Sequence, residues 1–99
     1  MTKRLVIRSD AHADMAEAAV WYEQQGAGLG HDFLAKVDSV FRLISKNPTI
    51  FPITHRQARL APLKRFPYIV IYRVFAEHIS VVAVLHGARD PASWKERLN

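Results

Sequence analysis

The chain of 99 residues contains no cysteine, which excludes a disulfide framework, a thiolate metal site and a cysteine nucleophile. A small domain without disulfides is typical of the cytoplasm, where we expect this protein. Long apolar runs are also missing. Behind the basic N-terminus only residues 5–7 are continuously apolar, which argues against a signal peptide. No run approaches the ~20 apolar residues of a membrane-spanning helix, so we expect no membrane partner.

Motifs of the common hydrolytic and phosphate-binding sites are absent as well. The glycines at positions 26, 28 and 30 are not followed by a Lys-Ser or Lys-Thr pair, so they do not form a phosphate loop. The five histidines lack the spacing of metal ligands, and no serine lies in a nucleophile-elbow pattern. We therefore expect no metal and no cofactor, and neither a catalytic triad nor zinc chemistry.

The chain is rich in apolar and basic residues. Hydrophobic residues make up 49% of it, which predicts one folded domain over residues 1–99 rather than disorder. Fourteen Lys and Arg against nine Asp and Glu give a net charge of +5. This charge favours an acidic partner, such as nucleic acid or a nucleoprotein machine, although solubility alone explains it equally well.

The first half of the chain predicts one strand and two helices. Residues 4–8 suit a short strand, and Ser9 or Asp10 is placed to cap a helix that extends to about residue 25. Its apolar stripe has helical spacing and consists of Met15, Ala18, Ala19 and Tyr22, widened by Trp21. A second helix is expected over residues 31–46. The short glycine-containing connection predicts an antiparallel helical hairpin.

The second helix has a clean apolar face and a defined end. Its apolar residues are Phe33, Val37, Val40, Phe41 and Ile44. Asp38 and Arg42 are four residues apart and are expected to pair on the exposed side. The Asn-Pro pair at 47–48 ends the helix, because the residue before a proline disfavours helical geometry.

The second half predicts three strands and a short terminal helix. Strands are expected over residues 55–61, 67–75 and 78–86, the last two joined by a tight turn. Asp90 and Pro91 suit the cap and first position of a helix with Trp94 and Leu98 on one face. The fold class is therefore α+β, in the order β-α-α-β-β-β, with the helical hairpin on one face of a mainly antiparallel sheet.

A basic constellation is the main candidate site. It consists of Arg56, Arg59, Lys64, Arg65, Arg73, His86 and Arg89. Because antiparallel neighbours run in opposite directions, Lys64 and Arg65 before one strand should lie near His86 and Arg89 after the next. Such a cluster suits phosphate binding, and with a general base it would suit RNA cleavage.

Each of these residues also has a structural interpretation. His86 is as consistent with a packed, hydrogen-bonded histidine as with a functional one. Arg89 with Asp90 would simply fix the turn before the terminal helix. Arg73 is better explained as a surface or edge cation. Trp21, Tyr22, Tyr68 and Tyr72 are better explained by packing, since Tyr68 and Tyr72 share one sheet face by the period of two.

Taken together, the chain resembles the RelE/ParE superfamily of small bacterial toxins, and within it the ParE branch most. The resemblance covers nearly the whole chain and depends on the order of several short motifs. They are Ala13-Asp-Met15, Trp21-Tyr22, Gly28-Leu-Gly30, Phe33-Leu34, Asn47-Pro48, Phe51-Pro52, Arg59, Arg65-Phe-Pro-Tyr68, His86-Gly-Ala-Arg-Asp-Pro91 and Trp94. It implies the same fold, and a toxin neutralised by an antitoxin that wraps it beside the helical hairpin.

The resemblance implies one of two targets. RelE-like members cut mRNA in the ribosomal A site, whereas ParE-like members poison DNA gyrase and are not known as enzymes. RelE-like nucleases place a Lys or Glu before the central hairpin and a Tyr near the C-terminus. Here residues 53–61 have neither Lys nor Glu, and no tyrosine follows Tyr72. RelE-like nucleases also place an Arg near the start of the central hairpin and an Arg or His at the end of the last strand, and Arg65 and His86 or Arg89 match these two positions. Two of the four expected positions are therefore missing, which favours the ParE branch.

The leading hypothesis is a ParE-like gyrase inhibitor with a cognate ParD-like antitoxin as partner. Its expected target-binding residues are Arg59, Lys64, Arg65, His86, Arg89 and Trp94. The alternative is a ribosome-dependent mRNA endonuclease, with His86 as acid or base and Arg65 and Arg89 on the phosphate. A third hypothesis is a protein that has lost toxicity and only binds its antitoxin. In a chain this short, we also expect apolar residues to remain exposed for the antitoxin to cover.

Overall fold

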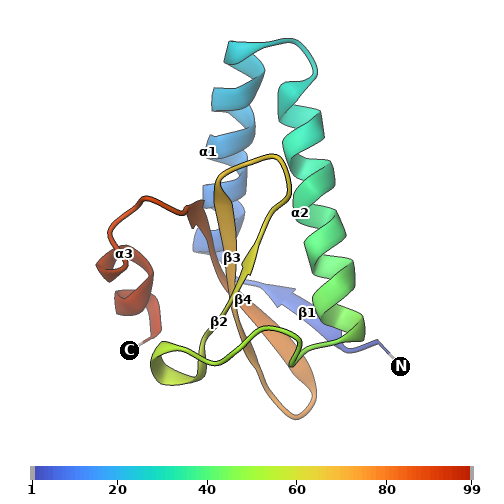
Figure 1. The fold of residues 1–99 in the computed structure, drawn as a ribbon, viewed down its shortest axis with the longest axis vertical. Coiled ribbons are helices and arrows are strands. Elements are labelled where there is room, and N and C mark those ends of the chain that lie inside the picture. Colours follow the sequence, from blue (N-terminus) through green and yellow to red (C-terminus); the bar gives the residue numbers. More distant parts are fainter. Residues whose placement is uncertain (1, 99) are drawn as a thin grey trace.

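The computed structural model describes residues 2–98 and confirms the order β-α-α-β-β-β (Figure 1). Its elements are β1 (Arg4–Ile7), α1 (Ser9–Gln25), α2 (Leu29–Lys46), β2 (Arg59–Pro62), β3 (Tyr68–Val74), β4 (His78–His86), α3 (Ala92–Lys95) and the 3₁₀ turn η2 (Glu96–Leu98). None of the helices within residues 2–98 is long and apolar enough to cross a membrane. The predicted α+β class is therefore confirmed.

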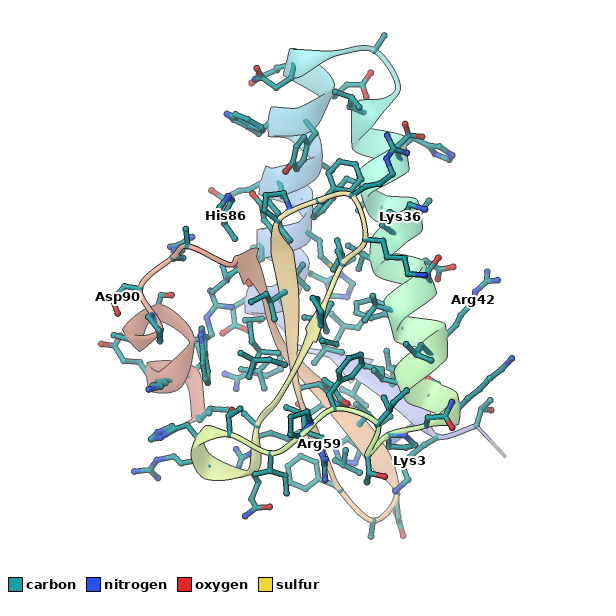
Figure 2. The ribbon with its side chains drawn as sticks, viewed as in Figure 1. Lys3, Lys36, Arg42, Arg59, His86 and Asp90 are labelled. Atoms are coloured by element: carbon teal, nitrogen blue, oxygen red, sulfur yellow. The ribbon has the colours of Figure 1, made fainter. Side chains whose placement is uncertain are left out.

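The four strands form one sheet in the order β1-β4-β3-β2. Strands β2, β3 and β4 are the predicted antiparallel meander, and β1 adds to β4 in parallel. The register pairs Tyr68 with His86 at one end of β3, and Arg59 with Tyr72 near the other end. These two ends of the sheet will be called the His86 end and the Arg59 end; Figure 2 shows the two labelled residues well apart.

The helical hairpin covers one face of the sheet. Val70 and Tyr72 on β3 point into this core, together with the apolar face of α2. The hairpin turn is fixed by Glu23, whose carboxylate accepts hydrogen bonds from the N–H groups of Gly28 and Gly30. These bonds lower the pKa of Glu23. At Gly30 a Cβ would lie 2.6 Å from the Ala19 carbonyl oxygen, so the close approach of the helices requires glycine.

The opposite face of the sheet has a second, smaller core. Ile69 and Ile71 alternate with the residues that face the hairpin, and they pack with Trp94 and Leu98 of the C-terminal segment. The terminal helix begins at Ala92, one residue later than predicted. The Asp90 carboxylate still accepts a hydrogen bond from the Ala92 N–H, as a capping residue does.

Several boundaries differ from the sequence prediction. Residues 55–57 form a 3₁₀ turn rather than the start of a strand, because Arg56 and Gln57 have positive φ angles. The first helix is preceded by Arg8 at the cap position, and neither Ser9 nor Asp10 caps it. Asp10 instead lies within the first turn, where its carboxylate accepts from the Ala11 N–H. The second helix begins two residues earlier than predicted, at Leu29 rather than at position 31.

The sequence favoured packing for Trp21, and its ring does contact Tyr22 edge-on with centroids 5.1 Å apart, but Trp21 does not lie in the core. Its side chain is 54% exposed, because α1 turns Ala11, Asp14 and Ala18 toward the sheet and leaves Trp21 on the flank. Tyr22 does pack against the core, as predicted. An exposed tryptophan beside a polar pocket is a functional candidate rather than a core residue.

Candidate functional site

The His86 end of the sheet brings β3, β4 and α1 together. Two backbone hydrogen bonds fix the chain after β4: the Gly87 N–H donates to the Pro67 carbonyl at 2.8 Å, and the Arg89 N–H donates to the His86 carbonyl at 3.0 Å. The second bond closes a tight turn that returns Arg89 toward β3. His86 and Arg89 therefore lie on one short turn next to the start of β3, and Figure 2 shows His86 and Asp90 from this region.

These residues line a pocket of about 260 Å³, which we call the His86 pocket. Its walls come from α1, β3, β4 and the turn after β4. The lining residues are Asp14, Glu17, Ala18, Trp21, Tyr68, Val84, Leu85, His86 and Arg89. The pocket thus combines an imidazole, a guanidinium, two carboxylates and two aromatic rings within a small volume.

His86 is oriented by two contacts. Its Nδ1 accepts a hydrogen bond from the Ala88 N–H at 3.0 Å, so a neutral ring carries its proton on Nε2. The ring packs against Tyr68, with centroids 5.4 Å apart and planes at 69°. Nε2 is therefore the ring nitrogen available to an incoming molecule. His86 is thus hydrogen-bonded and in contact with Tyr68, although it lies exposed at the surface.

Tyr68 is held in its neutral form by its surroundings. Burial raises the pKa of its hydroxyl, while Arg89 lowers it and the carboxylates of Asp14 and Glu17 raise it again. Behind Tyr68 lies an aromatic cluster in which its ring is 5.0 Å from Phe33 and 5.9 Å from Tyr22. The hydroxyl of Tyr68 therefore serves as a hydrogen-bonding group on a rigid base.

Asp14 anchors the pocket to the C-terminal segment. The Arg97 guanidinium donates to both oxygens of Asp14, at 2.6 and 3.0 Å, and also to the Val82 carbonyl at 3.2 Å. Asp14 accepts a further bond from the Val84 N–H. These bonds provide partners for the Val82 carbonyl and the Val84 N–H, which lie on β4 just after the segment that pairs with β1. The hydrogen bonds with Asp14 raise the pKa of the Arg97 guanidinium, so Arg97 stays charged.

The predicted convergence of four cations is only partly correct. His86 and Arg89 share the pocket, but Lys64 lines a different groove beside α2. Arg65 has a φ of 71° and its guanidinium lies over the Phe66 ring at 5.6 Å. Neither Lys64 nor Arg65 lines the His86 pocket; both lie on the loop between β2 and β3, whose Leu63 and Phe66 are buried.

The remaining expected target-binding residues lie elsewhere. Arg59 is at the opposite end of the sheet, where its Nη1 donates to the carbonyls of Phe51 and Thr49. It therefore holds the loop after α2. Trp94 is buried and packs in the second core, so it positions the terminal helix and does not offer its ring to a partner. Neither residue adjoins the His86 pocket.

Sequence reasoning missed Glu17, and it assigned Asp14, Trp21 and Tyr68 no place in a polar site. A signal for Asp14 was available. It lies three residues after Ala11 and four before Ala18, on the buried stripe of α1. A carboxylate on such a stripe requires a cationic or backbone partner. Glu17 gave no such signal, because an exposed glutamate on a helix is common.

The arrangement suits binding of an anionic or polar group rather than metal chemistry. Arg89 supplies a charged fork, and His86 Nε2 and the Tyr68 hydroxyl supply hydrogen bonds. Within residues 2–98, no group of three or more His, Asp or Glu side chains is arranged to hold a metal ion. The exposed Trp21 provides a flat apolar wall beside these groups.

Comparison with known proteins gives one consistent result. The model of the ParE toxin of type II toxin–antitoxin systems, parDE, matches residues 5–91. Toxin ParE2 from two strains of Mycobacterium tuberculosis, CDC 1551/Oshkosh and H37Rv, is 30% identical over 92 residues, covering 92% of this chain and 88% of each relative. A solved chain of the chromosomal ParDE system from P. aeruginosa has a TM-score of 0.63 at 16% identity, covering 86% of this chain and 96% of that one, and so shares the fold. Since the family match spans most of the chain, the protein belongs to the ParE toxin family of type II toxin–antitoxin systems.

Proposed function

We propose that this ParE-type toxin arrests growth by binding and inhibiting DNA gyrase, and that a cognate antitoxin neutralises it. The family match over residues 5–91 supports the ParE branch, whose resemblance implies gyrase as the target. Gyrase is a cytoplasmic nucleoprotein machine, so the proposal places the toxin in the cytoplasm. The net charge of +5 would favour association with gyrase bound to DNA.

The separation of the cations is the observation on which the proposal depends most. Cleavage of RNA builds up negative charge on the phosphate, and nucleases stabilise it with several converging cations. Of the four cations, only His86 and Arg89 line the His86 pocket, while Lys64 lines the groove beside α2 and Arg65 lies over the Phe66 ring. Dispersed cations on an exposed end of the sheet favour a binding surface over a phosphoryl-transfer site.

The proposed gyrase-binding surface is the His86 end of the molecule. His86 and Arg89 form its centre, and Lys64 and Arg65 on the neighbouring loop extend it. Trp94 would contribute by fixing the terminal helix, and Arg59 by fixing the loop after α2. Exposed charges on this surface should make binding weaken as salt is raised.

The antitoxin is proposed to cover apolar residues next to the helical hairpin. A groove of about 480 Å³ lies between α2 and the loop before β3, lined by Lys36, Ser39, Val40, Leu43, Phe51, Pro62, Leu63 and Lys64. On the hairpin itself Val20, Trp21 and Leu34 are exposed. Burying these residues would stabilise the folded toxin, so the complex should unfold at a higher temperature than the toxin alone. Equal unfolding temperatures, measured by calorimetry, would contradict this part of the proposal.

The deciding experiment uses purified gyrase, relaxed plasmid and the toxin freed of antitoxin. The proposal predicts loss of supercoiling and accumulation of cleaved plasmid, both reversed by adding the antitoxin. A toxin that is folded by circular dichroism and arrests growth, yet leaves gyrase unaffected, would exclude the gyrase assignment.

A second function is favoured by one specific observation. Glu17, Tyr68, His86 and Arg89 share the His86 pocket, so a carboxylate and a tyrosine hydroxyl that the sequence pattern lacked are supplied by α1 and β3. His86 Nε2 could then act as acid or base in RNA cleavage, with Arg89 on the phosphate. The test is mRNA cleavage in a translating extract. His86→Ala should abolish it without loss of fold, and absence of cleavage by the unaltered protein would exclude this alternative.

A further inference from the structure

A groove of about 540 Å³ lies between β1 and the C-terminal end of α2, two elements that Figure 1 shows side by side. We call it the β1 groove. It is lined by Thr2, Lys3, Arg4, Leu5, Phe41, Arg42, Ser45 and Lys46. Four of these eight residues are cations and none is acidic, although the chain as a whole contains nine Asp and Glu. The β1 groove shares no lining residue with the His86 pocket or with the groove proposed for the antitoxin.

Three of the four cations in the β1 groove have no carboxylate partner. Within residues 2–98, Lys3, Arg4 and Lys46 form no ion pair, and Arg4 and Lys46 are exposed. Arg42 differs from them, because its Nε lies 2.9 Å from the Asp38 carboxylate. Since this carboxylate offsets its charge, Arg42 is not counted among the cations available to a ligand. The groove therefore offers three uncompensated positive charges.

Lys3 is held in position by two hydrogen bonds. Its backbone N–H donates to the Ser45 carbonyl at 2.9 Å, and its Nζ donates to the Phe75 carbonyl at 2.8 Å. The first bond ties the chain before β1 to α2, and it occupies a carbonyl at the negative end of that helix. The second bond leaves the ammonium two further donors. The lysine is therefore presented by a fixed backbone, and the helix end opposes a bound anion less.

Positive charge continues from the β1 groove across the sheet. Arg4 on β1 is in register with His78 on β4, and Arg73 on β3 is in register with Ser80, two residues further along β4. Arg4 and Arg73 therefore share the face opposite the helical hairpin. They are two strands apart, which corresponds to roughly 10 Å across the sheet. Cations spread in this way suit a polymer with repeated negative charges better than a single small anion.

The composition of this surface favours nucleic acid over an acidic protein. Protein interfaces have a centre that is depleted of charged residues and enriched in aromatic ones. In the β1 groove the two large apolar residues, Leu5 and Phe41, are half-buried and pack against the core of the helical hairpin. The exposed lining residues are all polar or charged. Protein–DNA interfaces are polar and strongly positive in this manner.

The aromatic residue next to these cations favours a duplex over a single strand. Proteins that bind single strands present aromatic rings on which the bases stack. Here the Phe75 ring stacks on His78, with centroids 5.0 Å apart, and the Arg73 guanidinium lies 5.6 Å from its centroid. The ring is thus engaged by its own neighbours. A duplex requires no such ring, because it presents its phosphates outward and keeps its bases stacked inside.

We infer that the β1 groove binds the phosphate backbone of double-stranded DNA without regard to its sequence. Lys3, Arg4 and Lys46 contact separate phosphates, and Arg73 adds its charge to the neighbouring sheet face. The inference goes beyond the proposed function and does not depend on gyrase being the target, because it is tested on DNA alone.

The test measures the fluorescence anisotropy of a labelled DNA duplex of arbitrary sequence. The chain freed of antitoxin is titrated into it at several chloride concentrations. Three phosphate contacts predict that log K falls with the logarithm of the salt concentration with a slope of about −2.7. Arg4→Gln and Lys46→Gln should each bring this slope closer to zero by about one unit. Both side chains are exposed, so both variants should fold, which circular dichroism verifies.

A matched variant distinguishes the β1 groove from the net charge of the protein. Lys95→Gln removes the same charge as Lys46→Gln, but from α3, which does not line the groove, so it should leave the slope unchanged. The inference is overturned if the unaltered chain binds the duplex without salt dependence, or if Lys95→Gln changes the slope as much as Lys46→Gln. It is also overturned if polyglutamate or single-stranded RNA binds more tightly than the duplex.

Discussion

The two ends of β3 both carry cations, but they differ in what surrounds those cations. At the His86 end, Arg97 is paired with the buried Asp14, and Arg89 lies beside Glu17 and a neutral tyrosine. At the Arg59 end, Arg59 and Arg73 line a hollow that has no carboxylate among its lining residues. The first end balances its charge internally, and the second does not.

This difference concerns how the charged groups at each end are compensated within the chain. A buried cation that is paired and hydrogen-bonded stabilises the fold without outside help, and it fixes α1, β4 and the terminal segment together. The His86 end is therefore held together by charged contacts within the chain.

The largest expected effect is a loss of stability when the Asp14–Arg97 pair at the His86 end is broken. Arg97→Leu leaves Asp14 buried without its cation, and it should lower the free energy of unfolding by about 3–5 kcal/mol. Urea unfolding followed by circular dichroism measures this loss. Arg42→Leu is the matched control, because its pair with Asp38 is 78% and 57% exposed and should contribute at most about 1 kcal/mol. Similar losses in the two variants would show that the Asp14–Arg97 pair is not a buried anchor.

A smaller effect concerns the function of the same end. Arg89→Gln removes the guanidinium of the His86 pocket and leaves the buried pair intact, so the fold should persist. If this surface binds gyrase, inhibition of supercoiling should require about tenfold more protein, equivalent to roughly 1.4 kcal/mol of binding free energy. Arg42→Gln, with the same change of charge on α2, should leave inhibition unaltered. An equal loss in both variants would mean that only net charge matters.

A comparison of two tyrosines at opposite ends of β3 gives a more modest effect. The Tyr72 hydroxyl donates to the Pro48 carbonyl at 2.9 Å, whereas the Tyr68 hydroxyl has no hydrogen-bond partner within residues 2–98. Tyr72→Phe should therefore lower the free energy of unfolding by about 1 kcal/mol. Tyr68→Phe should change it by well under that amount. The reverse order in urea unfolding would contradict the assignment of Tyr72 as the anchor of the loop after α2.

Much of the fold was predictable because its signals are periodic and local. Strands β3 and β4 are continuous apolar runs, and the spacing of Phe33, Val37 and Ile44 defines the buried face of α2. The strand predicted from residue 55 was wrong at its start. There Arg56 and Gln57 take positive φ, which nothing in their side-chain types indicates.

The site was less predictable, because sequence shows which cations are near one another along the chain but not where they point. Strand order predicted that Lys64 and Arg65 would join His86 and Arg89, but only His86 and Arg89 line the His86 pocket. Lys64 instead lines the groove beside α2, and Arg65 lies over the Phe66 ring. Glu17 and Trp21 entered the pocket through the packing of α1 on β4, a contact between segments far apart in sequence. That contact depends on the tertiary fold and has no local pattern.

The last prediction uses pH to test whether Arg89 lies against Tyr68. Burial holds the pKa of Tyr68 above its usual value of about 10, and Arg89 counteracts this by lowering it. Arg89→Gln should therefore move this pKa further up, while Arg65→Gln should leave it unchanged; the ring signals of Tyr68 in an NMR titration report both. Because the pKa of Tyr68 is higher in the folded state than in the unfolded state, Tyr68 contributes to the free energy of unfolding fully below its unfolded-state pKa. This contribution is lost as the pH rises through its folded-state pKa. Burial also raises the pKa of Tyr22 and Tyr72, so urea midpoints should fall above about pH 10. If the pKa of Tyr68 does not change in Arg89→Gln, the Arg89 guanidinium does not lie against Tyr68 in the His86 pocket.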